Sequence, residues 1–226
     1  MHVAIDALLI LAAYLLGSIP FGLIVVRLIN GRDLRTVESG RTGGTNALRA
    51  AGPWAGALTG TLDVVKAAGI VLLAKALTPD AWVHTLTAIA AILGHNYSIF
   101  LAERRPDGRL HLRGGAGGSA AGGGAIGLWP PILLILLPLA GLVWYGIGFA
   151  SVMTMSIALI AIVVFAVRAA LGFSPCQYVL YGVLAEVLLL IALRPNIGRL
   201  LKGTERRHGW QARHAGQKQP EGLASK

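Results

Sequence analysis

Long apolar stretches alternate with short polar ones along most of the chain. The apolar stretches cover residues 4–27, 54–77, 82–102, 116–129, 131–147, 151–170 and 176–193. Most of them approach the roughly 20 residues that an α-helix needs to cross a bilayer. Backbone polar groups in lipid must be hydrogen-bonded within the segment, which a helix achieves. The pattern predicts an all-α, polytopic integral membrane protein with about seven transmembrane helices, in a single domain over residues 1–207.

Composition agrees with this pattern and excludes an ordinary soluble domain. Hydrophobic residues make up 55% of the 226 residues, charged residues only 13%, and the mean hydropathy is +0.67. The first apolar stretch is too long for a signal peptide and has no basic leading region, so we expect a retained helix. Residues 208–226 are polar and basic without apolar periodicity, which predicts a disordered cytoplasmic tail.

The placement of basic residues predicts the topology. All but three of the 20 Lys and Arg residues lie in three segments, residues 27–52, 103–114 and 194–226. Because cytoplasmic loops are enriched in Lys and Arg, we assign these segments to the cytoplasm and expect an outward N-terminus. The net charge of +10 then reflects topology and attraction to anionic lipid. Nucleic-acid binding is not expected, since no basic face carries stacking aromatic residues.

The loop over residues 38–49 has the composition of an anion site. It combines small residues with hydroxyl, amide and guanidinium groups, namely Ser39, Arg41, Thr45, Asn46 and Arg49. Unobstructed backbone N–H groups, O–H donors and guanidinium forks together suit a phosphate. The alternative is a glycine-rich connector whose arginines only anchor the topology. We expect these five residues to contact substrate.

A second candidate region joins the end of the third apolar stretch to a glycine run. His95 ends that stretch, and Arg113 directly precedes the glycines over residues 114–124. Such glycines permit close backbone approach, either to a phosphate or to a neighbouring helix. The candidates here are His95, Arg113, Gly114, Gly115 and Gly117. His95 could also simply be satisfied by a backbone carbonyl.

Two smaller polar clusters fall near the same membrane face. Ser151 begins the sixth stretch, although hydroxyls in membrane helices often bond to their own backbone. Asn196 and Arg199 are spaced as an i,i+3 pair on one short interfacial helix, or are snorkelling anchors. All three are candidate site residues.

The remaining polar groups are read as structural. Asp63 and Lys66 are spaced i,i+3 inside the second stretch, where ionisable groups are costly, so we expect a mutual salt bridge. The single Cys176 excludes an intrachain disulfide and is interpreted as a packing thiol rather than a nucleophile.

In this order, the motifs resemble those of the acyl-phosphate-dependent glycerol-3-phosphate acyltransferases of bacterial membranes. The resemblance covers almost the whole chain before the tail. Its motifs are the opening run at residues 17–22, the loop at 39–49, Leu62, Asp63 and Lys66, Gly94 and His95, and the closing run at 196–205.

The resemblance implies a seven-helix bundle in the bacterial plasma membrane with its active site at the cytoplasmic surface. It implies transfer of an acyl group from acyl phosphate to the 1-hydroxyl of glycerol 3-phosphate, which yields lysophosphatidic acid for phospholipid synthesis, with no metal or other cofactor. The implied catalytic residues are Ser39, Asn46, His95 and Asn196. The implied substrate-binding residues are Arg41, Thr45, Arg49, Arg113, Gly114, Gly115, Gly117, Ser151 and Arg199.

The chain departs from the family pattern at four polar positions. Arg41 replaces an asparagine, Ala116 the lysine of the glycine loop, Gly148 an arginine and Leu193 a histidine. We therefore keep a catalytically inactive lipid- or phosphate-binding relative as the alternative function. A small transporter is less favoured, because the two halves show no convincing repeat. Other basic residues, including Arg113, could restore the lost charge.

Overall fold

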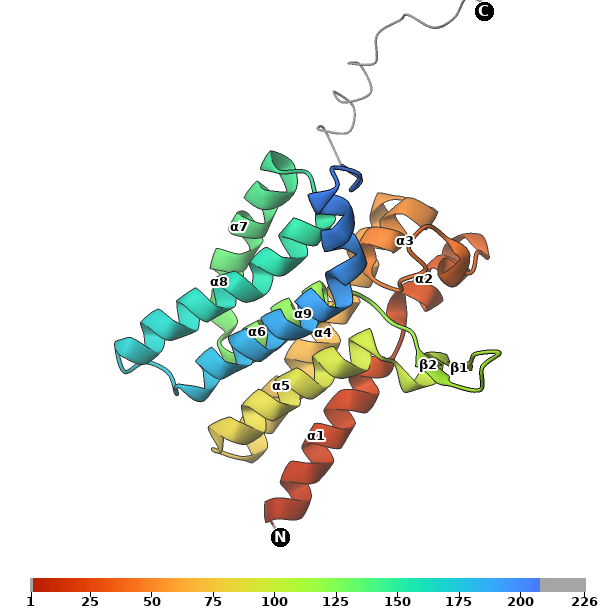
Figure 1. Cartoon of the computed structure of the whole chain (residues 1–226). Coiled ribbons are helices and arrows are strands. Elements are labelled where there is room, and N and C mark those ends of the chain that lie inside the picture. The colour runs from red at the N-terminus through yellow and green to blue at the C-terminus, as the bar shows by residue number, and fades with distance from the viewer. Residues whose placement is uncertain (1, 208–226) are drawn as a thin grey trace, which may run out of the picture.

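The computed structural model describes residues 2–207 and consists of helices with one small hairpin (Figure 1). The α-helices are α1 (His2–Ser18), α2 (Phe21–Asn30), α3 (Gly44–Ala51), α4 (Pro53–Leu77), α5 (Ala81–Asn96), α6 (Gly118–Leu128), α7 (Leu133–Gly146), α8 (Ala150–Ala170) and α9 (Gln177–Leu201). Single 3-10 turns occur at η1 (Leu34–Thr36), η2 (Ile99–Leu101) and η3 (Pro130–Ile132). Strands β1 (Ala102–Arg104) and β2 (Leu110–Leu112) pair antiparallel. The predicted tail lies outside the described residues.

The predicted helical membrane protein is confirmed at the level of its long helices. Four segments are long and apolar enough to cross a membrane: Val3–Asn30, Pro53–Leu77, Ala150–Ala170 and Gln177–Leu201. Helices α5, α6 and α7 are shorter, at 16, 11 and 14 residues. The total of seven spans and the outward N-terminus therefore stay predictions.

The first apolar stretch is divided into two helices, which the predicted single helix did not anticipate. Pro20 has no backbone N–H and disfavours helical geometry at the residue before it, so α1 ends at Ser18. Two carbonyls at the break accept hydrogen bonds from side chains. Lys66 Nζ donates to the Ile19 carbonyl at 2.8 Å, and Ser98 Oγ donates to the Ser18 carbonyl at 2.5 Å.

Small residues let the helices pack backbone against backbone. A Cβ placed on Gly94 of α5 would lie 2.1 Å from the Tyr14 carbonyl oxygen of α1. No side chain fits there, because real Cβ atoms do not come closer than about 3 Å to another heavy atom. Between α8 and α9 the buried side chains are larger. The fully buried rings of Phe165 and Tyr181 pack there edge to face. This packing brings the polar ends of α3, α5, α8 and α9 together at one end of the bundle (Figure 1).

Three further predictions can be compared with the fold. The stretch predicted at 82–102 is too long, because α5 ends at Asn96 and the chain continues into η2 and the hairpin. The Asp63–Lys66 salt bridge is confirmed, with Oδ1 and Nζ 2.7 Å apart and both side chains buried. The packing role of Cys176 is wrong, since this residue is exposed before α9.

Candidate active site

The loop before α3 is held in shape by the side chain of Asn46. Its Nδ2 donates to the carbonyls of Leu34, Val37 and Arg41 at 3.2, 3.0 and 2.8 Å. Gly40 permits the turn because its φ of 65° lies in the left-handed region. Asn46 Oδ1 is buried and has no hydrogen-bond partner among the described residues. One end of the amide therefore builds the loop, and the other end remains available as an acceptor.

Arg41 connects this loop to α9. Its guanidinium Nη2 donates to the carbonyl of Ala192, in the helical turn that precedes Pro195. A carbonyl oxygen has two lone pairs, so a carbonyl within a helix can still accept from a side chain. Burial and then the charge of Arg199 lower the pKa of Arg41, and burial lowers the pKa of Arg49. Guanidinium groups nevertheless stay protonated at neutral pH, so the loop presents positive charge.

The cluster predicted as one short interfacial helix forms the last two turns of α9 and the segment directly after it. The helix continues through Pro195 and ends in a Schellman motif, in which Gly203 has a φ of 69°. The Thr204 N–H donates to the Arg199 carbonyl at 2.8 Å, which completes the motif. The chain therefore reverses direction directly after the helix.

This reversal returns Glu205 to two predicted site residues. Asn196 Nδ2 donates to Glu205 Oε1 at 2.8 Å, and Arg199 Nε donates to Oε2 at 2.9 Å. The Glu205 side chain is only 6% exposed. Our site prediction omitted Glu205, although it lies in the closing motif, because the linear sequence does not show the reversal at Gly203.

The first glycines of the glycine run pack against the end of α5. The Gly115 N–H donates to the His95 carbonyl at 2.8 Å, and a Cβ on Gly115 would lie 1.9 Å from His95 Nε2. Gly117 has a φ of 94°, and its Cβ would lie 2.8 Å from Asn96 Oδ1. Gly115 is therefore needed for close approach to α5, which was one of the two predicted alternatives.

The buried carboxylate of Asp63 contacts the imidazole of His95. Asp63 Oδ1 lies 3.4 Å from His95 Nδ1 and 2.7 Å from Lys66 Nζ. Lys66 also donates to the Ile19 carbonyl at the break between α1 and α2. The orientation of His95 thus depends on a chain of contacts that crosses the bundle core.

Ten of the thirteen predicted site residues line one cavity of about 360 Å³: Ser39, Arg41, Thr45, Asn46, Arg49, His95, Gly117, Ser151, Asn196 and Arg199. The Ser151 hydroxyl is buried without a hydrogen-bond partner among the described residues. Met153, Ile157 and Leu193 give the same cavity an apolar wall. Ala116 also lines it, so three departures from the family pattern, Arg41, Ala116 and Leu193, lie at the cavity surface.

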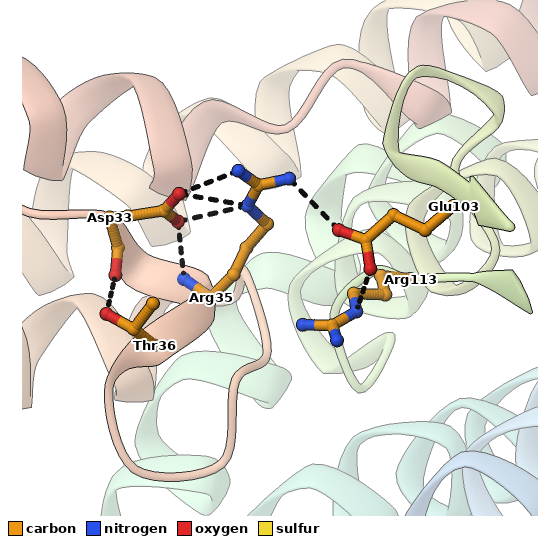
Figure 2. A network of polar contacts seen from close by, with 5 residues as sticks. All are labelled: Asp33, Arg35, Thr36, Glu103 and Arg113. Carbon is orange, nitrogen blue, oxygen red and sulfur yellow. Dashed lines mark hydrogen bonds and ion pairs between the residues drawn. The ribbon is translucent and has the colours of Figure 1, made fainter. Parts of the chain in front are cut away.

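The other three predicted residues, Arg113, Gly114 and Gly115, line an adjacent pocket of about 530 Å³. Arg113 Nε is paired with Glu103 Oε2 at 3.0 Å. Figure 2 shows that Glu103 also binds Arg35, at 3.1 Å, and that Arg35 binds Asp33, at 2.7 Å. The hydrogen bond from Arg35 lowers the pKa of Asp33 to about 2. Arg113 is therefore part of an ion network between the first loop and the hairpin.

Comparison with known proteins identifies the family. Residues 7–203 match the family model described as glycerol-3-phosphate acyltransferase. The glycerol-3-phosphate acyltransferase of Rubrobacter xylanophilus is 38% identical over 205 residues, which cover 91% of this chain and 96% of the relative. That of Myxococcus xanthus is 39% identical over 204 residues, covering 88% and 97%.

Solved structures give the same result. The crystal structure of PlsY (YgiH), an integral membrane glycerol 3-phosphate acyltransferase, in its glycerol 3-phosphate form has a TM-score of 0.75 and 33% identity, covering 90% of this chain and 96% of that one. Its lysophosphatidic acid form has a TM-score of 0.74 and 32% identity, covering 92% and 97%. The chain therefore belongs to the glycerol-3-phosphate acyltransferase family.

Proposed function

We propose that this protein transfers a fatty acyl group from acyl phosphate to the 1-hydroxyl of glycerol 3-phosphate. The hydroxyl oxygen bonds to the acyl carbon and loses its proton, while the bond from the acyl carbon to the phosphate oxygen breaks. The products are lysophosphatidic acid and inorganic phosphate. Family membership supports the acceptor and the product, since the related crystal structures are described as glycerol 3-phosphate and lysophosphatidic acid forms.

The mixed lining of the cavity carries this proposal. It combines the arginines and polar side chains of the first loop and of the end of α9 with the apolar side chains of Met153, Ile157 and Leu193. A substrate that joins a phosphate to a fatty acyl chain needs both kinds of surface. Acyl phosphate is already activated, so alignment and neutralisation of phosphate charge supply much of the rate.

The roles of individual residues follow from their positions. Arg49 and Arg41 provide positive charge for a phosphate, with Ser39 and Thr45 as hydroxyl donors. Asn196 and Arg199 close the same cavity from α9, where Glu205 holds both. His95 and Ser151 contact the acceptor. Gly114 and Gly115 keep the glycine loop against α5.

The proposed topology places this cavity at the cytoplasmic surface of the plasma membrane, with seven spans and an outward N-terminus. The three basic segments support it, because parts of the first and third line the cavity and part of the second lines the adjacent pocket. A cysteine introduced within residues 105–109, with Cys176 replaced, should be protected from an impermeant thiol reagent in intact cells. Rapid labelling would show that the orientation is the opposite of the proposed one.

The decisive experiment compares acyl donors. Purified protein in detergent is given glycerol 3-phosphate with either palmitoyl phosphate or palmitoyl coenzyme A, and phosphate release and lysophosphatidic acid are measured. We expect turnover with palmitoyl phosphate alone. Equal or faster turnover with the thioester would refute the donor assignment.

A catalytically inactive relative is the second candidate, and the cavity wall favours it at two points. Ala116 and Leu193 replace a lysine and a histidine of the family pattern, and both line the cavity. The same assay decides, because an inactive relative would bind glycerol 3-phosphate in a calorimeter and form no lysophosphatidic acid from either donor.

A further inference from the structure

Two basic side chains outside the three basic segments meet at the end of the bundle away from the cavity. Lys75 lies in the last turn of α4 and Arg168 in the last turn of α8. Helix α8 begins at Ala150 on the cavity wall, so its last turn lies about 30 Å away along a 21-residue helix. The acyl transfer site therefore leaves both residues without a role.

The two cations converge on one turn of the chain. Lys75 Nζ donates to the carbonyl of Leu128, the last residue of α6, at 2.7 Å. The Arg168 guanidinium lies over the ring of Trp129, with its Cζ 3.9 Å from the ring centroid. Leu128 and Trp129 are consecutive, so two positive groups from different helices flank a single peptide unit.

Most of their hydrogen-bond donors are unused within the described part of the chain. An ammonium has three donors and a guanidinium five. Lys75 makes the one bond to Leu128, and Arg168 Nη2 donates to the Phe173 carbonyl at 2.9 Å. Arg168 Nε is buried without a partner, and no carboxylate among residues 2–207 pairs with either cation.

Helix dipoles explain part of this placement but do not complete it. Each helix C-terminus carries about half a negative charge, which favours a cation in the last turn. Such partial charges do not use the remaining donors of Lys75 and Arg168. Two adjacent cations with open donors present the chemistry that binds a phosphate oxygen.

The surroundings are those of a lipid headgroup rather than of open solvent. Leu77, Leu171 and Phe173 at the ends of α4 and α8 are 57%, 62% and 67% exposed. Helices α4 and α8 are both long and apolar enough to cross a membrane, so their ends lie near the lipid headgroups. Tryptophan is enriched at the membrane–water interface, which is where Trp129 would lie.

We propose that Lys75, Arg168 and Trp129 form a binding site for the phosphate of an anionic phospholipid. The phosphate oxygens accept from Lys75 Nζ and from the open donors of Arg168, and the acyl chains lie along the exposed apolar residues at the ends of α4 and α8. The site is separate from the catalytic cavity and does not depend on the proposed reaction.

Lipid retention tests the site directly. The full-length protein is purified in dodecyl maltoside and incubated with phosphatidylglycerol or phosphatidylcholine, and bound lipid is counted by native mass spectrometry. We expect wild-type protein to retain phosphatidylglycerol in preference. The Lys75→Gln/Arg168→Gln variant should weaken retention roughly 30-fold, the equivalent of about 2 kcal/mol for the lost charge-assisted hydrogen bonds to the phosphate.

The matched control is Arg32→Gln/Arg104→Gln, which removes two exposed cations at the cavity end. It should retain the lipid as wild type does. Unchanged thermal unfolding and unchanged acyl transfer in the Lys75 and Arg168 variant would show that the fold and the cavity are intact. Should the double variant be unstable, Lys75→Gln alone keeps an amide donor for the Leu128 carbonyl and should weaken retention about fivefold, since it removes one of the two charged groups that bond to the phosphate.

Competition separates a lipid from a free anion. Inorganic phosphate at millimolar concentration should not displace phosphatidylglycerol, because it lacks the contacts of the acyl chains. Displacement by phosphate would overturn the lipid assignment. Equal retention by wild type and the double variant, or equal retention of the two lipids by wild type, would overturn the site.

Discussion

The two basic loops at the cavity end use their arginines in different ways. In the first loop, Arg41 and Arg49 are partly buried, line the cavity and have lowered pKa values because of burial. In the second loop, Arg113 is 37% exposed and is paired with Glu103 of the hairpin. Both loops look alike in the sequence, where each contributes arginines beside glycines.

The contrast between Arg41 and Arg113 indicates that the group an arginine contacts decides how much of its charge is left for a substrate. Glu103 lies on β1, whose partner strand β2 ends directly before Arg113, so the hairpin itself delivers the counter-ion. Arg41 instead donates to a backbone carbonyl, which does not neutralise its charge. We therefore expect the first loop to bind phosphate and the second to hold the loops together.

Alanine at Arg49 and at Arg113 should separate the two roles most strongly. Arg49→Ala should lower kcat/KM about 30- to 1000-fold, since a charge-assisted contact made in the transition state is worth about 2–4 kcal/mol. Arg113→Ala should lower it about fivefold or less, because a partly exposed ion pair contributes about 1 kcal/mol at most. Steady-state phosphate release measures both, with Arg104→Ala as the control. A larger loss for Arg113→Ala would reverse the assignment.

The glycine loop offers the next largest effect. In Gly115→Ala the new Cβ would lie 1.9 Å from His95 Nε2, so the imidazole or the loop must move. Forced overpacking costs about 1–3 kcal/mol, which lowers the apparent Tm in detergent by about 2–10 °C. Turnover should fall as well, since His95 lines the cavity.

Gly69→Ala in α4 is the matched control, because a Cβ at this position would have no atom within 4 Å. There we expect unchanged turnover and slight stabilisation, as alanine favours a helix by about 0.5–1 kcal/mol over glycine. If Gly115→Ala and Gly69→Ala had the same effects on Tm and turnover, the contact between the glycine loop and His95 would matter for neither.

Apolar pattern and charge placement predicted the membrane class and the convergence of most site residues. Ser39, Asn46, Ser151 and Asn196 are far apart in sequence, yet the structure brings them to one cavity. Long apolar helices connected by basic segments leave few ways to arrange the polar ends, which is why this part of the prediction succeeded.

Contacts that depend on reversals of the chain could not be predicted. Glu205 reaches Asn196 only because Gly203 turns the chain back after α9. Glu103 meets Arg113 only because of a hairpin that begins inside a segment predicted to be helical. The division of the first helix at Pro20 could have been expected, since proline disfavours helical geometry at the residue before it.

Ala116→Lys tests whether the first loop already supplies enough charge. Arg41, Arg49 and Arg199 line the same cavity as Ala116. A further cation would lose solvation without gaining a new partner, so we expect turnover to change by less than about threefold. Measured phosphate release that rises from none in the wild type to a clear rate in the variant would instead show that the chain lost its activity with this lysine.

The ion network in Figure 2 should give the smallest effect, and it depends on pH. Arg35 lowers the pKa of Asp33 from 3.8 to about 2, so the ionised carboxylate stabilises the fold above pH about 4 and this contribution is lost as pH falls toward 2. Asp33→Asn should therefore lower the apparent Tm by about 2–4 °C at pH 6, because a partly exposed pair is worth about 1 kcal/mol at most. At pH 2.5 most of this difference should vanish, and turnover at pH 7 should stay near wild type, since Asp33 lines neither pocket. A turnover loss as large as that of Arg49→Ala would show that the network positions the first loop for catalysis.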